Sequence, residues 1–378
     1  MHTRRSAVIL GLAAMSTGCD GSPDDPGGQT RRYFIAAEQV EWDYAPHGNL
    51  ADPFFDEAAA AFLDQVTYDG AMEPGDVRIG TRYQKSLYRA YTDESFTIPV
   101  DVTPESRHLG ALGPTLYAEV GDTIEVVFRN DTPWPANMHP HGVSYDKANE
   151  GAPYDDGTAA GGDDRIEPGE SHLYVWGVPE RAGPPEGHQS SMAWMYHSHV
   201  DEVSDTYAGL MGTIVVTARG MARPDGRPSD VDRELTTLFH IYNEGHSPYL
   251  LENLARYTGM VEPEAMAVAM EDEDFEESNL KHSINGRLFA NLGGLTMRVG
   301  ETVRWYVMAM GTEVDVHTPH WHAATLVADG MRFDTIDLLP AAMIVADMVP
   351  DEPGSWLYHC HVNDHLEAGM MAVYEVRE

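Results

Sequence analysis

The sequence contains 378 residues, with 24 basic and 61 acidic side chains and a formal net charge of −37. This length suits two ordinary domains, each able to bury a core without disulfide bonds. The acidic excess argues against nucleic acid and anionic membranes as partners, although it would attract cations. An acidic, lysine-poor surface is also typical of proteins from saline habitats. We therefore assign the total charge to solubility and judge single carboxylates by their position.

Residues 1–19 read MHTRRSAVILGLAAMSTGC, with a charged start, a short apolar run and then small residues. This pattern predicts an export signal, and the apolar run is too short for a permanent membrane anchor. Arg4 and Arg5 resemble a twin-arginine signal. STGC resembles a lipoprotein cleavage site, although Ser16 stands where a larger apolar residue is usual. We expect a periplasmic, cell-surface or extracellular protein, and leave open whether Cys19 carries a lipid anchor.

The rest of the chain divides into two sets of predicted strands. Residues 20–30 are a Pro, Gly and Asp tether, and a first domain over 31–219 contains β-rich runs such as GDTIEVVFRND and GTIVVTAR. A polar linker over 220–230 precedes a second domain over 231–378, with runs such as TTLFHIYNE and MMAVYEV. PTLYAEVGDTIEVVF in the first domain is echoed by GLTMRVGETVRWYV in the second. Short strands bounded by turn residues, in two related copies, predict an all-β protein with two β-sandwiches.

Cys360 lies between two histidines in the stretch WLYHCHVNDHLEAGM. If Cys19 is lipidated or removed with the signal, the mature chain keeps this single cysteine and can form no intrachain disulfide. Side chains alternate along a strand, so His359 and His361 should face one side and Cys360 the other. One strand could then contribute to metal sites on both of its faces.

The Cys360 side can be completed by His365 and Met370, with His317 as the candidate second imidazole. Two histidines and a thiolate with a weak axial thioether form a blue (type 1) copper site for electron transfer. A structural zinc site is the competing interpretation. Four-coordinate zinc would not need the thioether and would leave the other clustered histidines unexplained.

Ten of the eighteen histidines fall in four short clusters, which are HPH at 139–141, HSH at 197–199, HTPHWH at 317–322 and HCHVNDH at 359–365. In each H-x-H pair of a strand, both imidazoles point the same way. Any one pair could be two surface histidines, but four clusters over two domains indicate shared metal sites.

These four motifs, in this order and spacing, resemble the signature of the multicopper oxidases, whose domains have the cupredoxin-like Greek-key fold. The resemblance implies four coppers per subunit, which together supply the electrons that reduce O2 to water. It assigns His139 and His320 to the type 2 copper. It assigns to the type 3 pair His141, His197, His199, His322, His359 and His361. Ser198 occupies in HSH the place of Cys360 in HCH, so the first domain should hold no blue copper, which argues against a two-domain nitrite reductase.

Further stretches, including LGPTLYAEVGD, NEGAPY, EDFEESN and INGRLFANLGGLTM, resemble the ferroxidase group of ceruloplasmin and hephaestin. Those proteins carry three two-domain repeats, and their trinuclear cluster lies between the first and last domains. A chain with one repeat can close the same ring as a homotrimer with clusters shared between subunits, as small two-domain laccases do. The resemblance therefore implies a homotrimer.

The same resemblance implies an Fe(II) site next to the blue copper. Glu277 and His282 have the spacing of two of its ligands, Asp364 immediately precedes His365, and Glu313 of a neighbouring subunit would be the fourth. Carboxylate and imidazole ligands suit iron. The alternative is that the two acids near the copper ligands only orient those histidines.

Two smaller matches concern Tyr145 and an acidic loop. Tyr145 matches a tyrosine near the trinuclear cluster of small laccases that lends an electron, and an ordinary buried tyrosine is the alternative. Lys147, through its carbonyl, with Asp163 and Asp164 resembles a calcium site of ceruloplasmin, and a solvated acidic loop is the alternative.

The sequence therefore predicts an exported multicopper oxidase that couples oxidation of a one-electron donor, with Fe(II) favoured, to reduction of O2. A laccase-like oxidase of phenols or Cu(I) is the first alternative. A non-catalytic copper-binding relative is the alternative from another class, and the complete set of copper-ligand residues argues against it.

Overall fold

The structure is a computed structural model that describes residues 28–48, 77–155 and 162–378. The predicted export signal with Cys19, and the tether up to residue 27, lie outside the described residues. Within the described part of the chain, no helix has the length and apolar character needed to cross a bilayer.

The first half of the chain forms a sandwich of two four-stranded sheets, with strand orders β2-β1-β4-β6 and β3-β8-β7-β5. Its strands are β1 (Thr30–Asp43), β2 (Arg82–Tyr91), β3 (Leu116–Glu119), β4 (Thr123–Asp131), β5 (His139–Pro140), β6 (Ser171–Gly177), β7 (Ser191–His197) and β8 (Met211–Thr217). In β4 every second residue from Ile124 is buried against the core, as alternation along a strand with one core face requires.

The second half forms another sandwich, with strand orders β10-β9-β12-β16-β14-β15 and β11-β18-β17-β13. Its strands are β9 (Arg233–Asn243), β10 (Leu280–Ile284), β11 (Thr296–Arg298), β12 (Val303–Ala309), β13 (Pro319–Trp321), β14 (Leu326–Ala328), β15 (Met331–Phe333), β16 (Met343–Met348), β17 (Gly354–Cys360) and β18 (Met371–Arg377). The prediction of an all-β protein built from two sandwiches is confirmed.

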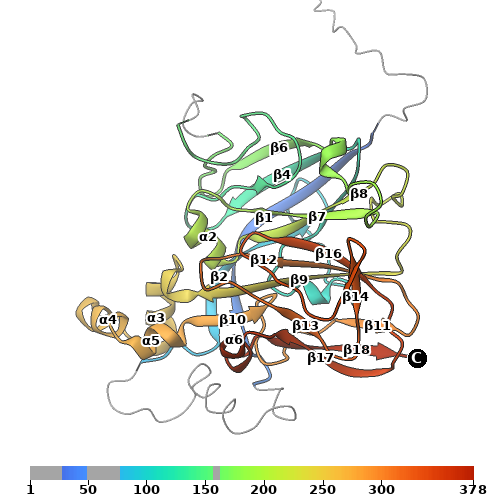
Figure 1. The fold of residues 1–378 in the computed structure, drawn as a ribbon. Coiled ribbons are helices and arrows are strands. Elements are labelled where there is room, and N and C mark those ends of the chain that lie inside the picture. The colour runs from blue at the N-terminus through green and yellow to red at the C-terminus, as the bar shows by residue number, and fades with distance from the viewer. Residues whose placement is uncertain (1–27, 49–76, 156–161) are drawn as a thin grey trace, which may run out of the picture.

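Helices in the described residues are short and lie outside the sheets. They are η1 (Arg107–Leu109), η2 (Glu180–Ala182), α2 (Glu202–Ala208), η3 (Glu244–His246), α3 (Leu250–Thr258), α4 (Pro263–Met270), α5 (Glu273–Ser278) and α6 (Asn363–Glu367). Figure 1 shows α3, α4 and α5 projecting together from one side of the molecule. Helices α2 and α6 are the ones that adjoin the histidine clusters.

The internal echo in the sequence corresponds to equivalent strands in the two sandwiches. β3 pairs in parallel with β8, and β11 pairs in parallel with β18. Likewise β1 runs parallel to β4, and β9 runs parallel to β12. The two domains therefore share one topology, to which the second domain adds β14 and β15.

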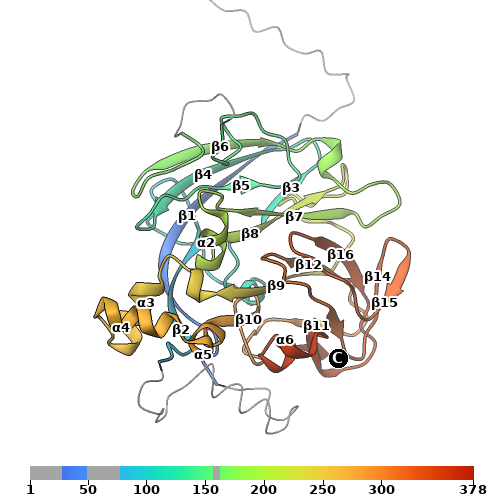
Figure 2. The ribbon, with the colours of Figure 1, turned by 60° about the vertical axis from the view of Figure 1, so that its left-hand side comes forward.

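The two sandwiches pack against each other along β7, β8, β12 and β16, as the turned view of Figure 2 shows. Every residue of β8 and β12 is buried, because one face of each strand fills its own core and the other contributes to the contact between domains. The Ser191 hydroxyl lies 2.9 Å from the Tyr306 hydroxyl across this contact, and Arg304 donates to Ser191 at 3.0 Å. The interface thus fixes how the domains, and the histidine clusters they carry, lie relative to each other.

Candidate metal centres

Strand β17 ends at Cys360, and the chain then folds back over that residue within ten positions. Helix α6 carries His365, whose carbonyl accepts a hydrogen bond from the Met370 amide at 2.9 Å. The Cys360 amide in turn donates to the Met370 carbonyl at 3.1 Å. The strand, short helix and returning strand therefore bring residues 360, 365 and 370 into one place.

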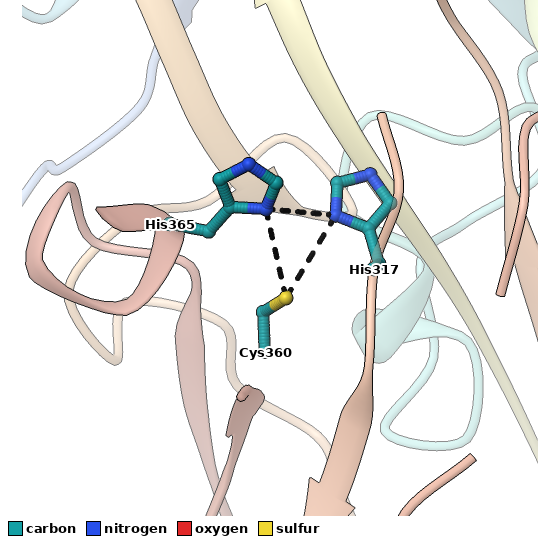
Figure 3. Close-up of side chains that lie close together, drawn as sticks. All are labelled: His317, Cys360 and His365. Atoms are coloured by element: carbon teal, nitrogen blue, oxygen red, sulfur yellow. Dashed lines mark hydrogen bonds between the residues drawn. The ribbon is translucent and has the colours of Figure 1, made fainter. Parts of the chain in front are cut away.

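His317, on the segment before β13, completes this Cys360 cluster (Figure 3). The Cys360 Sγ lies 3.6 Å from Nδ1 of His365 and 3.9 Å from Nδ1 of His317, and the two Nδ1 atoms are 3.2 Å apart. Cys360 and His317 are fully buried, and His365 is 8% exposed. Met370 is also fully buried and belongs to the same core cluster as Cys360.

The electrostatics of the Cys360 cluster suit a soft metal ion. Burial raises the pKa of the Cys360 thiol, and burial lowers the pKa of His365 to about 4. The imidazoles are therefore neutral at ordinary pH, and metal binding would release the thiol proton. Two imidazole nitrogens and one sulfur, with Met370 in the same buried core, suit a type 1 copper.

Asp315 is a neighbour of this cluster that the histidine motifs did not indicate. Its side chain is fully buried, and its Oδ1 lies 3.3 Å from Nε2 of His317. Burial raises the pKa of Asp315, but hydrogen bonds from His240 and His317 outweigh this and hold it well below its usual value. The spacing in EVDVH could have indicated this contact, because residues 315 and 317 share one face of an extended segment.

A second cluster lies on the opposite side of β17, where residue 320 pairs with residue 359 across the strands β13 and β17. Nε2 of His359 lies 3.2 Å from Nδ1 of His320 and 3.2 Å from Nε2 of His322. The His361 ring centroid is 5.3 Å from that of His320. His320 and His322 line an open pocket of about 500 Å³ that also includes Asp334.

The first domain carries the equivalent cluster, with residue 139 paired with residue 197 across β5 and β7. Nε2 of His141 lies 3.1 Å from Nε2 of His197, and the rings of His139 and His199 are 5.2 Å apart. Burial lowers the pKa of His197 to about 3 and that of His141 to about 4. These neutral imidazoles can also serve as metal ligands.

Within one chain, the first-domain and second-domain histidine clusters lie apart from each other. In Figure 1 strand β7 lies in the upper sandwich, whereas β13 and β17 lie at the bottom. Among the described residues, no group of three metal-ligand atoms combines histidines of both domains. Each cluster is therefore half of the eight-histidine set suggested by the motifs.

Where Cys360 stands in the second domain, the first domain has a buried hydrogen-bond network around Ser198. The Ser198 hydroxyl donates to Oδ2 of Asp205 on α2 at 2.6 Å. Oδ1 of Asn137 accepts from the His199 amide at 2.7 Å, and Nδ2 of Asn137 donates to the Gly151 carbonyl at 2.7 Å. Oxygen and amide groups thus surround Ser198, whereas imidazoles lie beside Cys360. That the first domain holds no blue copper stays a prediction.

Comparisons with known proteins agree with this arrangement. Two models described as multicopper oxidase match residues 110–220 and 257–378, which together are more than half of the chain. The chain belongs to the multicopper oxidase family. It is 39% identical to hephaestin of Mus musculus over 95% of this chain and 30% of that protein. It is 38% identical to ceruloplasmin of Homo sapiens over 92% of this chain and 30% of that protein.

A third relative, named Ferroxidase HEPHL1, of Homo sapiens, is 37% identical over 92% of this chain and 29% of that protein. The chain therefore spans about a third of the length of these relatives. Among solved structures, one described as a crystal structure of a multicopper oxidase has a TM-score of 0.56 and 20% identity over 92% of this chain and 89% of that one. At that identity the likeness concerns the fold, and it confirms the cupredoxin-type sandwiches.

In this multicopper oxidase, two of the four predicted iron ligands, His282 and Asp364, adjoin His365 of the Cys360 cluster. The ring of buried His282, on β10, is 5.3 Å from the ring of His365. Burial raises the pKa of Glu277 on α5, and the charges of Glu276 and Asp364 raise it further, so Glu277 and Asp364 interact electrostatically. Glu313 is exposed on the segment between β12 and β13.

Tyr145 and the predicted calcium ligands lie near the first-domain cluster. The Tyr145 ring is 36% exposed, and its centroid is 5.9 Å from that of His139. Asp163 and Asp164 are 5% and 7% exposed, and Oδ2 of Asp163 accepts from the Gly151 amide at 2.9 Å. These two acids are therefore buried, which differs from the solvated loop considered as an alternative.

Proposed function

We propose that this multicopper oxidase oxidises Fe(II) one electron at a time and reduces O2 to water. The observation that carries the proposal is the geometry of β17, where Cys360 meets His317 and His365 on one face while His359 meets two histidines on the other. Two metal-ligand clusters back to back on one strand suit transfer of electrons from a donor site to an O2 site.

The proposed ligands follow from these clusters. Copper would exchange single electrons at the Cys360 cluster and collect them for O2 at the histidine clusters. The type 1 ligands would be His317, Cys360, His365 and Met370. The type 2 ligands would be His139 and His320, and the type 3 ligands would be His141, His197, His199, His322, His359 and His361.

The chain itself supplies orientation and exclusion of water. His359 donates from Nδ1 to the Cys360 carbonyl at 2.7 Å. Its Nε2 therefore carries no hydrogen, and the lone pair of Nε2 faces His320 and His322. Burial of Cys360 in an apolar core keeps water from the thiolate and its ligands. His320 and His322 remain accessible from the open pocket.

We infer that the active form is a homotrimer in which the first-domain cluster of one subunit meets the second-domain cluster of the next. The separation of the two clusters within one chain supports this, because eight histidines that share three coppers must come within a few ångströms of each other. The open pocket beside His320 and His322 gives the partner's histidines a place to enter.

Fe(II) is the proposed donor because the ring of His282 lies beside that of His365, Asp364 adjoins His365 in the chain, and Glu277 interacts electrostatically with Asp364. Burial lowers the pKa of His282 to about 3, so its imidazole is neutral and able to bind a cation. Carboxylates stabilise Fe(III) over Fe(II), which favours loss of the electron. The relative named as a ferroxidase is consistent with this donor. Export, lipidation of Cys19, calcium at Lys147, Asp163 and Asp164, and electron donation by Tyr145 stay predictions.

The test compares oxidation of Fe(II) and of a phenol by the wild type and by a Glu277→Ala, His282→Ala double variant. We expect the double variant to lose Fe(II) oxidation at least tenfold and to keep phenol oxidation and copper content. Glu276→Ala, on the same exposed helix, is the matched control and should keep both activities. Unchanged Fe(II) turnover in the double variant would overturn the iron site and favour the laccase-like alternative.

A further inference from the structure

Asp315 has no place among the ligands proposed above, yet its carboxylate is held rigidly. Its Oδ1 accepts from the Ile241 amide at 2.8 Å, and its Oδ2 accepts from the Thr312 amide at 2.9 Å. Gly311 has a φ of 129°, and a Cβ at that position would lie 2.0 Å from Oδ2 of Asp315. The backbone at Ile241, Thr312 and Gly311 therefore encloses the Asp315 carboxylate closely and fixes its position, which we call its seat.

The seated carboxylate is directed at two imidazoles. Oδ1 lies 3.3 Å from Nε2 of His317 and 3.4 Å from Nδ1 of His240, which also lies 2.6 Å from the Met310 carbonyl. Because the carboxylate only accepts, Nε2 of His317 carries the hydrogen and Nδ1 is left with its lone pair. That Nδ1 is the atom 3.9 Å from the sulfur of Cys360.

We propose that Asp315 is a positioning residue that fixes the ring and tautomer of His317 and lowers the reduction potential of copper bound in the Cys360 cluster. This inference rests on the proposed type 1 site. A carboxylate that accepts from a metal-bound imidazole makes that imidazole a stronger electron donor. Its negative charge in a buried site also stabilises Cu(II) relative to Cu(I).

A lowered potential has a consequence for the choice of donor. An electron acceptor of lower potential oxidises only donors that give up electrons readily, and Fe(II) held by carboxylates is such a donor. Asp315 would therefore adapt the copper to Fe(II) rather than to phenols, without touching either substrate.

The test is a redox titration of the fully copper-loaded protein with Asp315→Asn, read through the thiolate-to-copper absorption and the electron paramagnetic resonance spectrum. We expect a higher reduction potential and an altered copper hyperfine splitting, with the number of coppers unchanged. Asp122→Asn is the matched control. Asp122 is also buried, and it accepts from the amides of Gln29 and Glu119, far from the Cys360 cluster. It should lose stability similarly and keep the wild-type potential.

The wild-type spectrum separates this inference from the proposed function. A wild type that holds copper but lacks the thiolate-to-copper band would overturn the type 1 site itself. A wild type with the band, and an Asp315→Asn potential equal to or below the wild-type value, would overturn the role of Asp315 alone.

If Asp315→Asn does not fold, the variant His240→Gln provides a second test by the same redox titration. This change leaves Asp315 in its seat and weakens a competing contact to Oδ1, so Oδ1 should accept more strongly from His317. We expect the potential of this variant to fall. An unchanged or higher potential would contradict the proposal.

Discussion

The carbonyl oxygen of Cys360 accepts a hydrogen bond from Nδ1 of His359 at 2.7 Å. The two residues are adjacent on β17, and their side chains enter different clusters. The hydrogen bond and the intervening covalent bonds therefore form a short route between the proposed electron entry site and the proposed O2 site. In the first domain, Nδ1 of His197 makes the equivalent hydrogen bond to the Ser198 carbonyl at 3.0 Å. Residue 198 has a hydroxyl in place of the thiol.

Replacement of Cys360 by serine should remove the proposed type 1 copper and keep the histidine clusters. The backbone carbonyl that orients His359 remains in this variant, so we expect one copper fewer per chain, loss of the thiolate-to-copper absorption and loss of donor oxidation. Metal analysis, absorption spectroscopy and an oxidation assay measure these three outcomes. The matched variant Ser198→Cys should gain no such band, because the side chains in contact with residue 198 are Asn137 and Asp205 and neither is an imidazole. A second band would show that the first domain can still form a type 1 site.

Mixed subunits test the proposed sharing of clusters. His141→Ala with His199→Ala disables the first-domain cluster, and His322→Ala with His361→Ala disables the second-domain cluster. Each double variant alone should be inactive. If the two are unfolded together and refolded as a mixture, about one quarter of the subunit contacts would join two intact halves. We therefore expect up to about a quarter of wild-type O2 consumption from the mixture, and none from separately refolded variants that are combined afterwards. Equal inactivity of both mixtures would contradict the shared-cluster model.

Asp205 should make the free energy of unfolding depend on pH. Burial raises the pKa of this carboxyl from 3.8 to about 6 in the folded protein. The folded state therefore binds a proton that the unfolded state has lost between these pH values. Stability falls as the pH rises through this window, by about 3 kcal/mol in total.

Asp205→Asn removes this pH dependence and keeps the local hydrogen bonds. The Ser198 hydroxyl and the Asp201 amide both donate to Oδ2 of Asp205, so one amide oxygen can accept from both. We would measure the free energy of unfolding of the wild type and the variant by chemical denaturation at pH 4 and pH 8. The stability of the variant relative to the wild type should be greater at pH 8 than at pH 4. A difference independent of pH would mean that Asp205 titrates as it does in the unfolded chain.

Much of the fold could be predicted from local patterns. Strands such as β4 and β18 were indicated by short β-rich runs bounded by turn residues. Both histidines of each H-x-H pair were predicted to face the same side of their strand. Residues 199 and 361 lie just beyond the ends of β7 and β17, and the paired rings still lie within 5.5 Å of each other. Alternation therefore continues over the strand ends.

The two-sandwich class and the residues able to ligate copper could be predicted from the sequence, since periodicity and ligand spacing are local properties of the chain. Contacts between distant segments could not be predicted in this way. They include the hydrogen bond from the Ile241 amide to Asp315, the side chains of Asn137 and Asp205 beside Ser198, and the separation of the two histidine clusters within one chain. These relationships join strands that are distant in sequence. They depend on how the sandwiches pack, and no spacing along the chain encodes that packing.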